Sequence, residues 1–266
     1  MRILVTNDDG IASPGLWALA RELAKVGEVL VAAPNRDMSG SAAAMMLRRP
    51  ARVRACKPPR DARHLAAYAV SAPPASCALL ALRGLIAPGP IDLVVSGINA
   101  GPNLGRDALL SGTVGAAFVA ALEGVPAVAV SLTRGETWHW QTPAFVAARL
   151  AQRLHEAAPR GGLVLNVNSP NLPLAALAGV RIARPSRDCC LSRLLVEADP
   201  QRPRTFALTT ERQVPRSVDE GSDEWAVANG YISITPLLPE VAVDRADARL
   251  AEWVADLLTL GDLVEV

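Results

Sequence analysis

The sequence carries almost no net charge. Its 266 residues include 27 Lys and Arg against 26 Asp and Glu, which leaves a formal charge of +1. Proteins that bind nucleic acid or anionic lipid over a wide surface usually carry a large excess of basic residues. We therefore expect no nucleic-acid partner, while a locally basic pocket stays compatible with this balance.

Long hydrophobic runs are also missing. The most apolar stretch, residues 116–132, is broken by Glu123 and Pro126, and it falls short of the roughly 20 residues that a membrane helix needs. At the N-terminus, a short apolar segment is followed at once by Asp8 and Asp9, which is not the pattern of a signal peptide. We predict a cytoplasmic protein with no membrane partner.

Cysteine and histidine are scarce. The cysteines form no CxxC pair and no zinc-type spacing with histidine, and we expect free thiols in a reducing compartment: Cys56, Cys77, Cys189 and Cys190. The histidines show no triad spacing, which favours core or surface roles: His64, His139 and His155. The sequence also lacks a Walker loop and a GxGxxG motif, so ATPase and dinucleotide-binding functions lose their main support.

What the chain does contain is an alternation of strands and helices, with half of its residues hydrophobic. We predict strands at residues 2–6, 29–33, 91–96, 127–132, 162–167 and 231–235, with short strands near 51–53 and 67–70. Helices are predicted at residues 14–26, 73–85, 113–123, 143–158 and 245–260. This alternation indicates an α/β fold with a Rossmann-like, doubly wound, mostly parallel sheet. The first two strands should be parallel.

The alternation weakens after residue 180. Residues 184–217 contain many Arg and Pro and little periodicity, which is typical of a surface hairpin or arm. We predict a single domain over residues 1–266, with its core at about 1–180 and 225–266 and a C-terminal hairpin arm at about 184–217.

Polar residues follow three of the predicted strands. In open parallel sheets, ligands bind beyond the carboxyl ends of the strands, so the three loops should converge at one edge. Carboxylate, hydroxyl and carboxamide oxygens are hard ligands that suit Mg²⁺ or Mn²⁺. The residues concerned are Asn7, Asp8 and Asp9, then Asn35, Arg36, Asp37 and Ser39, and then Asn99, Asn103 and Asp107.

Asp8 and Asp9 are consecutive acids at a strand end, where like charges repel each other. A divalent cation relieves that repulsion. The structural alternative is that one Asp caps the following helix while the other is solvated. The pair together with the other two loops favours a metal site.

Ser111, Gly112 and Thr113 stand directly before an apolar helix. Helix N-termini offer free N–H groups and a positive dipole end, which suits a phosphate group. The alternative is plain helix capping by Ser111 or Thr113, and both roles are compatible. The preceding loop, at residues 97–107, contains three glycines: Gly97, Gly101 and Gly105. Glycine permits a close approach of the backbone to a ligand.

These segments together resemble those of the SurE survival-protein nucleotidases. The resemblance rests on the order and spacing of four segments: Asn7-Asp8-Asp9-Gly10, Ser39-Gly40-Ser41, residues 96–105, and Ser111-Gly112-Thr113-Val114. It covers residues 1 to about 135 closely and residues 160–240 more loosely, where Leu165-Asn166-Val167-Asn168 and residues 230–236 are similar to later family segments.

The resemblance implies a metal-dependent 5′/3′-nucleotidase with one divalent ion per subunit, Mg²⁺ or Mn²⁺. It also implies a homodimer or homotetramer whose C-terminal arm is exchanged between subunits. By position, the metal ligands would be Asp8, Asp9, Ser39 and Asn99. The phosphate contacts would be Asn103, Ser111, Gly112 and Thr113.

Several segments depart from the family pattern. Leu110 stands where an aromatic residue is usual, an acid is missing from residues 72–77, residues 45–47 read Met-Met-Leu, and the arm near Asp199 lacks the family's tyrosines. The metal ligands are unaffected, but base preference and arm exchange stay open.

The expected reaction is attack of a water molecule in line on a metal-bound phosphate, with Asp8 or Asp9 taking the proton. Two other functions are left open: a phosphatase for another small phosphoester, and a non-catalytic nucleotide-binding regulator. The regulator would be marked by a lost metal ligand, and none is lost.

Overall fold

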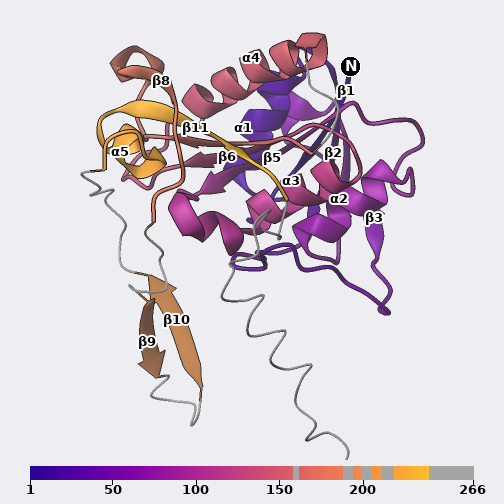
Figure 1. Ribbon diagram of the computed structural model, residues 1–266. Coiled ribbons are helices and arrows are strands. Elements are labelled where there is room, and N and C mark those ends of the chain that lie inside the picture. Colours follow the sequence, from indigo (N-terminus) through magenta and orange to yellow (C-terminus); the bar gives the residue numbers. More distant parts are fainter. Residues whose placement is uncertain (158–161, 188–193, 199–204, 211–218, 240–266) are drawn as a thin grey trace, which may run out of the picture.

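A nine-stranded sheet forms the centre of the protein (Figure 1). The structure is a computed structural model and describes residues 1–157, 162–187, 194–198, 205–210 and 219–239. The strand order in the sheet is β3-β4-β2-β1-β5-β6-β7-β11-β8. This arrangement confirms the predicted α/β fold with a doubly wound, mostly parallel sheet.

The inner strands are parallel to one another. They are β1 (Arg2–Thr6), β2 (Glu28–Pro34), β4 (Ala66–Val70), β5 (Leu93–Ala100), β6 (Ala127–Leu132) and β7 (Val164–Ser169). The predicted parallel pairing of the first two strands is confirmed, with Ile3 opposite Val29 and Leu4 opposite Leu30. All these strands therefore end at the same edge of the sheet, as the site prediction requires.

The outer strands include the antiparallel members of the sheet. At one edge, β3 (Val53–Ala55) runs antiparallel to β4. At the other edge, β11 (Tyr231–Leu237) runs antiparallel to β7, and β8 (Gly179–Ile182) pairs with β11 in parallel. The C-terminal part of the chain thus completes the same sheet that the N-terminus begins.

Two layers of helices cover the sheet. Helices α1 (Pro14–Leu23) and α4 (Gln141–Ala157) pack against each other on one face, and α2 (Pro74–Leu82) and α3 (Gly112–Leu122) pack against each other on the opposite face. Strand β1 shows that both faces of the sheet are buried. Ile3 and Val5 pack in the hydrophobic cluster on the α1 and α4 side, while Leu4 packs in the cluster on the α2 and α3 side. Because strand side chains alternate between faces, such a strand is hydrophobic throughout.

Several predicted boundaries were wrong. The first helix ends at Leu23 rather than at residue 26, and the residues up to Gly27 form a hydrogen-bonded turn. Strand β5 continues to Ala100, and the predicted loop at 97–107 also contains a short 3₁₀ helix, η2 (Gly105–Leu109). The end of β5 was predicted as a loop because its glycine lowers the hydrophobicity on which strand prediction depends.

Two further elements were not predicted. Strand β8 is short, and its Ile182 is 82% exposed, so it lacks the alternation of a half-buried strand. Helix α5 (Asp223–Ala228) has only 6 residues, which is too short for a helical period to be visible. A 3₁₀ helix, η1 (Arg60–Ala62), and another, η3 (Leu174–Ala176), complete the described elements.

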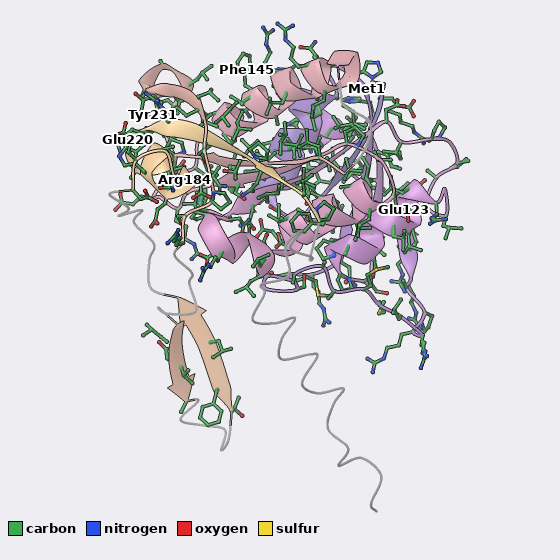
Figure 2. The ribbon with its side chains drawn as sticks, viewed as in Figure 1. Met1, Glu123, Phe145, Arg184, Glu220 and Tyr231 are labelled. Atoms are coloured by element: carbon green, nitrogen blue, oxygen red, sulfur yellow. The ribbon has the colours of Figure 1, made fainter. Side chains whose placement is uncertain are left out.

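The predicted hairpin arm is present. Strands β9 (Leu194–Ala198) and β10 (Phe206–Thr210) form an antiparallel pair that extends away from the nine-stranded sheet (Figure 1). At the root of the arm, Arg184 forms a 2.6 Å ion pair with Asp219 and donates to the Glu220 carbonyl (Figure 2). The predicted closing helix at 245–260 lies outside the described residues.

No helix in the described part of the chain is long and apolar enough to cross a membrane.

The Cys77 thiol should be unreactive in the folded protein. It is fully buried, its Sγ contacts the Ala72 carbonyl, and burial raises its pKa to about 12. At pH 8 almost none of it is thiolate, which is the reactive form. We expect iodoacetamide followed by peptide mass spectrometry to label the partly buried Cys56 before Cys77, and to label both in urea. Labelling of native Cys77 at the rate seen in urea would contradict this packing.

Candidate active site at the carboxyl edge of the sheet

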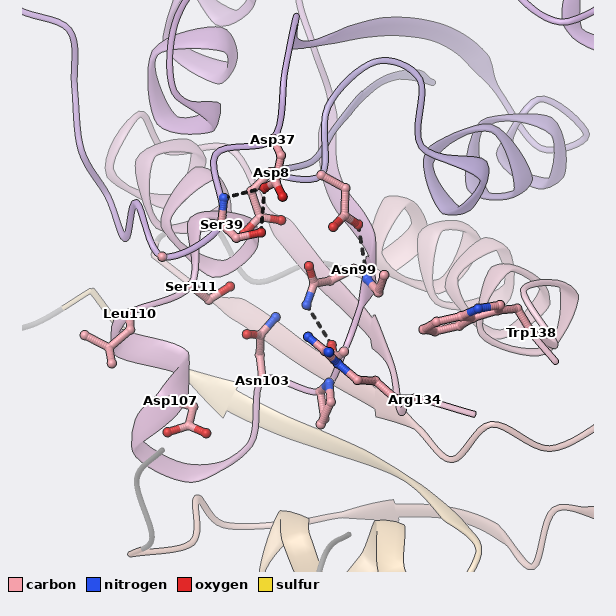
Figure 3. A pocket seen from close by; sticks show the side chains of 15 residues that line it. Asp8, Asp37, Ser39, Asn99, Asn103, Asp107, Leu110, Ser111, Arg134 and Trp138 are labelled. Atoms are coloured by element: carbon pink, nitrogen blue, oxygen red, sulfur yellow. Dashed lines mark hydrogen bonds between the residues drawn. The ribbon is translucent and has the colours of Figure 1, made fainter. Parts of the chain in front are cut away.

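One cavity gathers most of the predicted site residues. It has a volume of about 510 Å³ and lies at the carboxyl ends of β1, β2, β5 and β6 (Figure 3). Its lining includes all four predicted metal ligands, Asp8, Asp9, Ser39 and Asn99. It also includes two of the four predicted phosphate contacts, Asn103 and Ser111. The convergence of the three loops is therefore observed, while the roles of the individual residues stay predictions.

Asp8 is held by the start of α3. The Thr113 amide donates to its Oδ2 at 3.0 Å, and the Thr113 hydroxyl donates to its Oδ1. A carboxylate at a helix N-terminus is stabilised by the free N–H groups and the dipole. Thr113 is fully buried and directed at Asp8, so the structure uses this predicted phosphate contact to position a predicted metal ligand. Burial still raises the pKa of the Asp8 carboxyl above its usual range.

Asp9 lies beside Asp8 with one face toward the cavity. Its Oδ2 accepts a hydrogen bond from the Ala100 amide at 3.1 Å. Desolvation raises the pKa of Asp9 to about 6, the charge of Asp8 adds to the rise, and the Arg134 guanidinium partly offsets it. Two carboxylates in so little water are costly to ionise together without a cation.

Ser39 is positioned by Asp37, whose Oδ1 accepts from the Ser39 amide at 2.7 Å and from the Ser39 hydroxyl at 2.6 Å. Because the hydroxyl proton is directed at Asp37, the lone pairs of Oγ are left to face a cation. Asp37 also lines the cavity. Asp37 belongs to the polar residues predicted after the second strand, and its position two residues before Ser39 is the Asx-turn spacing that could have predicted this contact.

The amide side chains of Asn99 and Asn103 are fixed by hydrogen bonds. Asn99 donates from Nδ2 to the Gly101 carbonyl at 2.7 Å, which turns its Oδ1 away from that contact. Asn103 donates from Nδ2 to Ser131 Oγ at 2.8 Å. Strand β7 holds the backbone of Asn103: the Asn168 side chain accepts from its amide at 2.7 Å, and Asn166 donates to its carbonyl at 2.8 Å.

Ser111 and Gly112 form the start of α3. Ser111 caps the helix, because its Oγ accepts from the Val114 amide at 3.1 Å. Its own hydroxyl proton is left to donate, so capping and a phosphate contact are compatible. A Cβ atom at Gly112 would meet Ser41 Oγ at 2.6 Å and Asp8 Cβ at 2.9 Å. Gly112 therefore lets the helix approach the end of β1 closely, and it is not among the lining residues.

The donor set fits a divalent cation. Of the described residues lining the cavity, four are aspartates and one, Arg134, is basic. No three His, Cys, Asp or Glu side chains are grouped to hold a metal ion anywhere in the described ranges. A metal would therefore need the neutral oxygens of Ser39 and Asn99 beside the Asp8 and Asp9 carboxylates. Such an all-oxygen set suits Mg²⁺ or Mn²⁺.

Reasoning from sequence missed residues in the loop after β6. Arg134 and Trp138 both line the cavity, and they precede α4. Strand β6 was predicted, and the rule that ligands lie beyond strand ends applied to it equally. A fourth loop would have added Arg134, the basic residue that this acidic cavity contains.

Helix α5 supports the loop that contains Asn103 and Gly105. Asp223 on α5 accepts from the Gly105 amide at 2.7 Å and from the Ser186 amide at 2.9 Å. Burial raises the pKa of Asp223 despite these hydrogen bonds. The root of the arm and the loop carrying Asn103 are thereby joined through one side chain.

Replacing Arg134 with Ala should weaken the binding of an anionic substrate. We expect kcat/KM for a phosphomonoester to fall about 10- to 100-fold, because a charge-assisted contact to phosphate is lost. Arg134→Lys should recover part of the loss, since it keeps the charge without the planar fork. Arg149→Ala removes an exposed arginine on α4, outside the lining, and serves as the control. Equal losses in Arg134→Ala and Arg149→Ala would show that Arg134 has no specific role.

The fold and this cavity define a class: an α/β protein with a cavity lined by oxygen-bearing side chains at the carboxyl edge of its sheet. The chain belongs to the SurE family, because the family model described as Survival protein SurE matches residues 3–190. This confirms the resemblance seen in the sequence.

Its relatives are similar over nearly their whole length. A 5′-nucleotidase SurE from Dehalococcoides mccartyi (strain CBDB1) is 42% identical over 239 residues, which cover 89% of this chain and 88% of the relative. A 5′/3′-nucleotidase SurE from Edwardsiella ictaluri is 40% identical, covering 95% and 96%. The crystal structure of the SurE protein from Aquifex aeolicus matches with a TM-score of 0.77 and 31% identity, covering 97% of this chain and 100% of that one.

Proposed function

We propose that this protein is a metal-dependent phosphomonoesterase that hydrolyses nucleoside 5′-monophosphates to nucleoside and phosphate, with 3′-monophosphates as further candidate substrates. The observation that carries the proposal is the convergence of predicted metal ligands and predicted phosphate contacts in one cavity of about 510 Å³. The names of the relatives, 5′-nucleotidase and 5′/3′-nucleotidase, support the substrate class.

The proposed cofactor is one divalent ion per subunit, Mg²⁺ or Mn²⁺, held by Asp8, Asp9, Ser39 and Asn99. When bound, such an ion supplies neutralisation of the negative charge on the phosphate oxygens. The support for it is the excess of aspartates over arginine in the lining, together with the adjacent, largely buried carboxylates of Asp8 and Asp9, whose mutual repulsion a cation would relieve.

The protein's own groups would bind and orient the phosphate. Ser111 offers its free hydroxyl proton, Asn103 offers the second Nδ2 proton, and Arg134 offers its guanidinium. Holding the phosphate in line with the attacking water supplies much of the rate enhancement. Asp9 is the better placed acid to accept the water proton, because Thr113 already occupies both oxygens of Asp8.

We also propose that the protein works in the cytoplasm as a homodimer or homotetramer. This proposal rests on the sequence and on the arm, whose two strands carry exposed apolar side chains such as Val196, Phe206 and Leu208. Light scattering of the full chain, compared with a chain that lacks residues 188–218, tests whether the arm contributes to assembly.

The decisive experiment is phosphate release from a panel of nucleoside 5′- and 3′-monophosphates, ribose 5-phosphate and a short polyphosphate. Each is assayed with Mg²⁺, with Mn²⁺ and with EDTA. Release from nucleotides that depends on metal supports the proposal, and the ranking identifies the position and base. A preference for sugar phosphate or polyphosphate would support another phosphatase instead. No release under any condition would leave a nucleotide-binding regulator as the remaining function.

A further inference from the structure

Two tryptophans form an aromatic wall at the cavity. Aromatic residues make up only 4% of the chain, yet two of its five tryptophans, Trp138 and Trp140, lie in the loop between β6 and α4. Their rings stack with centroids 4.6 Å apart and planes 2° apart. Trp138 lines the active-site cavity, and Figure 3 shows it across Asn99 and Arg134 from the Asp8 side.

The aromatic wall is held in place from beneath. Trp140 packs against the hydrophobic core, and its ring lies so close to Gly15 of α1 that a Cβ there would meet it at 2.9 Å. Asn171 ties the backbone on both sides of Trp138: its Oδ1 accepts from the His139 amide at 2.9 Å, and its Nδ2 donates to the Thr137 carbonyl at 2.5 Å. A side chain fixed in this way loses little freedom when a ligand stacks on it.

Trp138 nevertheless stays 37% exposed. Trp140 covers one face of its ring, and the exposed part borders both the active-site cavity and a second, more apolar hollow of about 450 Å³ that includes Phe145 and Leu174. A rigid, exposed, planar apolar surface beside a polar phosphate site matches the two ends of a nucleotide. The volume of the cavity also lies within the range of about 300–1,000 Å³ typical of small-molecule sites.

We propose that Trp138 is the base-recognition residue: the base of the nucleoside monophosphate stacks on its indole while the phosphate lies toward Asn103 and Ser111. The inference rests on the proposed function and adds the means by which nucleotides are told from other phosphoesters. Every base has a π-face, so stacking selects nucleotides without selecting one base, and the larger purines overlap the indole more than pyrimidines do.

The test separates the base from the phosphate. Trp138→Ala and Trp138→Phe are assayed against adenosine 5′-monophosphate and ribose 5-phosphate, which shares the sugar phosphate but has no base. For Trp138→Ala we expect KM for the nucleotide to rise about tenfold, the size of one base–aromatic stacking contact, with kcat little changed. Trp138→Phe should retain most of the affinity. Ribose 5-phosphate should be cleaved with unchanged kcat/KM by both variants.

Leu122→Ala is the control, because Leu122 is an exposed apolar residue at the C-terminal end of α3 that lines neither the active-site cavity nor the second hollow. It should leave both substrates unaffected. If Trp138→Ala lowers kcat/KM equally for both substrates, or for neither, the inference is overturned while the proposed function stands.

A binding measurement keeps the inference independent of catalysis. Titration of the protein with adenosine 5′-monophosphate in EDTA should quench the tryptophan fluorescence, and Trp138→Phe should remove most of the quenching. Quenching of the same size in both proteins would overturn the inference, even if the wild type releases no phosphate. Absence of phosphate release together with quenching that depends on Trp138 would instead reject the proposed function alone.

Discussion

Asp9→Asn should reduce phosphate release from nucleoside monophosphates at least about 100-fold, with the fold intact. The substitution preserves size, and the new amide oxygen can still accept the hydrogen bond from Ala100. It removes one of the two carboxylates that would bind the cation and take the proton. Steady-state phosphate release with Mn²⁺ measures the loss, and calorimetric titration with Mn²⁺ should show weaker binding.

The same variant should be at least as stable as the wild type when metal is removed. Burial and Asp8 raise the folded-state pKa of Asp9 from its usual value to about 6, so its ionised form destabilises the metal-free fold. The sign follows from proton linkage: stability due to Asp9 is highest when the group is protonated and is lost as pH rises from about 4 to about 6. In EDTA, the gain in Tm for Asp9→Asn should therefore be small at pH 4 and larger at pH 7.

Asp61→Asn provides the control for both measurements. Asp61 is an exposed acid that pairs with Arg21 on the surface, so its replacement should change neither activity nor metal affinity. A folded Asp9→Asn enzyme with undiminished turnover would rule out the assignment of Asp9 to the reaction.

Gly115→Ala should impair both stability and activity, although alanine is the better helix former by about 1 kcal/mol. Gly115 lies in α3, where a Cβ would meet the Ala42 carbonyl oxygen at 2.1 Å and the Ala43 nitrogen at 2.7 Å. These are backbone atoms of the loop that carries Ser39. We expect a net destabilisation of about 1–3 kcal/mol from overpacking. This loop carries Ser39, a proposed metal ligand, and displacing such a residue by about 1 Å slows catalysis. We therefore expect kcat/KM to fall about 10- to 100-fold.

Ala42→Gly offers a matched rescue. Ala42 has a φ of 48°, which glycine adopts without strain, so this change alone should be tolerated. In the double variant the loop is freer to move away from the new methyl group, and Tm measured by differential scanning fluorimetry should partly recover. Activity should recover less, because the shifted loop still carries Ser39. A Gly115→Ala protein more stable than the wild type would show that the close packing of α3 against this loop is not maintained.

Much of the architecture could be predicted because it depends on short-range patterns. Apolar strands such as Ala127–Leu132 and helices that begin at a Pro, such as α1, are visible within a dozen residues. The elements that were missed lack such a pattern. Helix α5 is too short, β8 is mostly exposed, and the glycine of β5 lowers its hydrophobicity.

The candidate site was found in sequence through chemistry rather than through shape. Oxygen-bearing side chains after parallel strands must share one edge, and the structure brings Asp8, Ser39 and Asn99 to one cavity. The roles within that cavity were less accessible. Thr113 was predicted to contact phosphate, yet its polar groups are directed at Asp8, which lies 105 positions earlier in the chain.

By itself, the sequence determined the kind of fold, the edge of the sheet where the candidate site lies and the hard-oxygen character of that site. These follow from periodicity, strand direction and residue type, which are local properties. Only the tertiary structure decided that α3 supports Asp8, that β7 holds Asn103 and that Trp138 stands beside the cavity. Each of these depends on contacts between residues far apart in the chain, and such contacts are set by packing of the whole molecule.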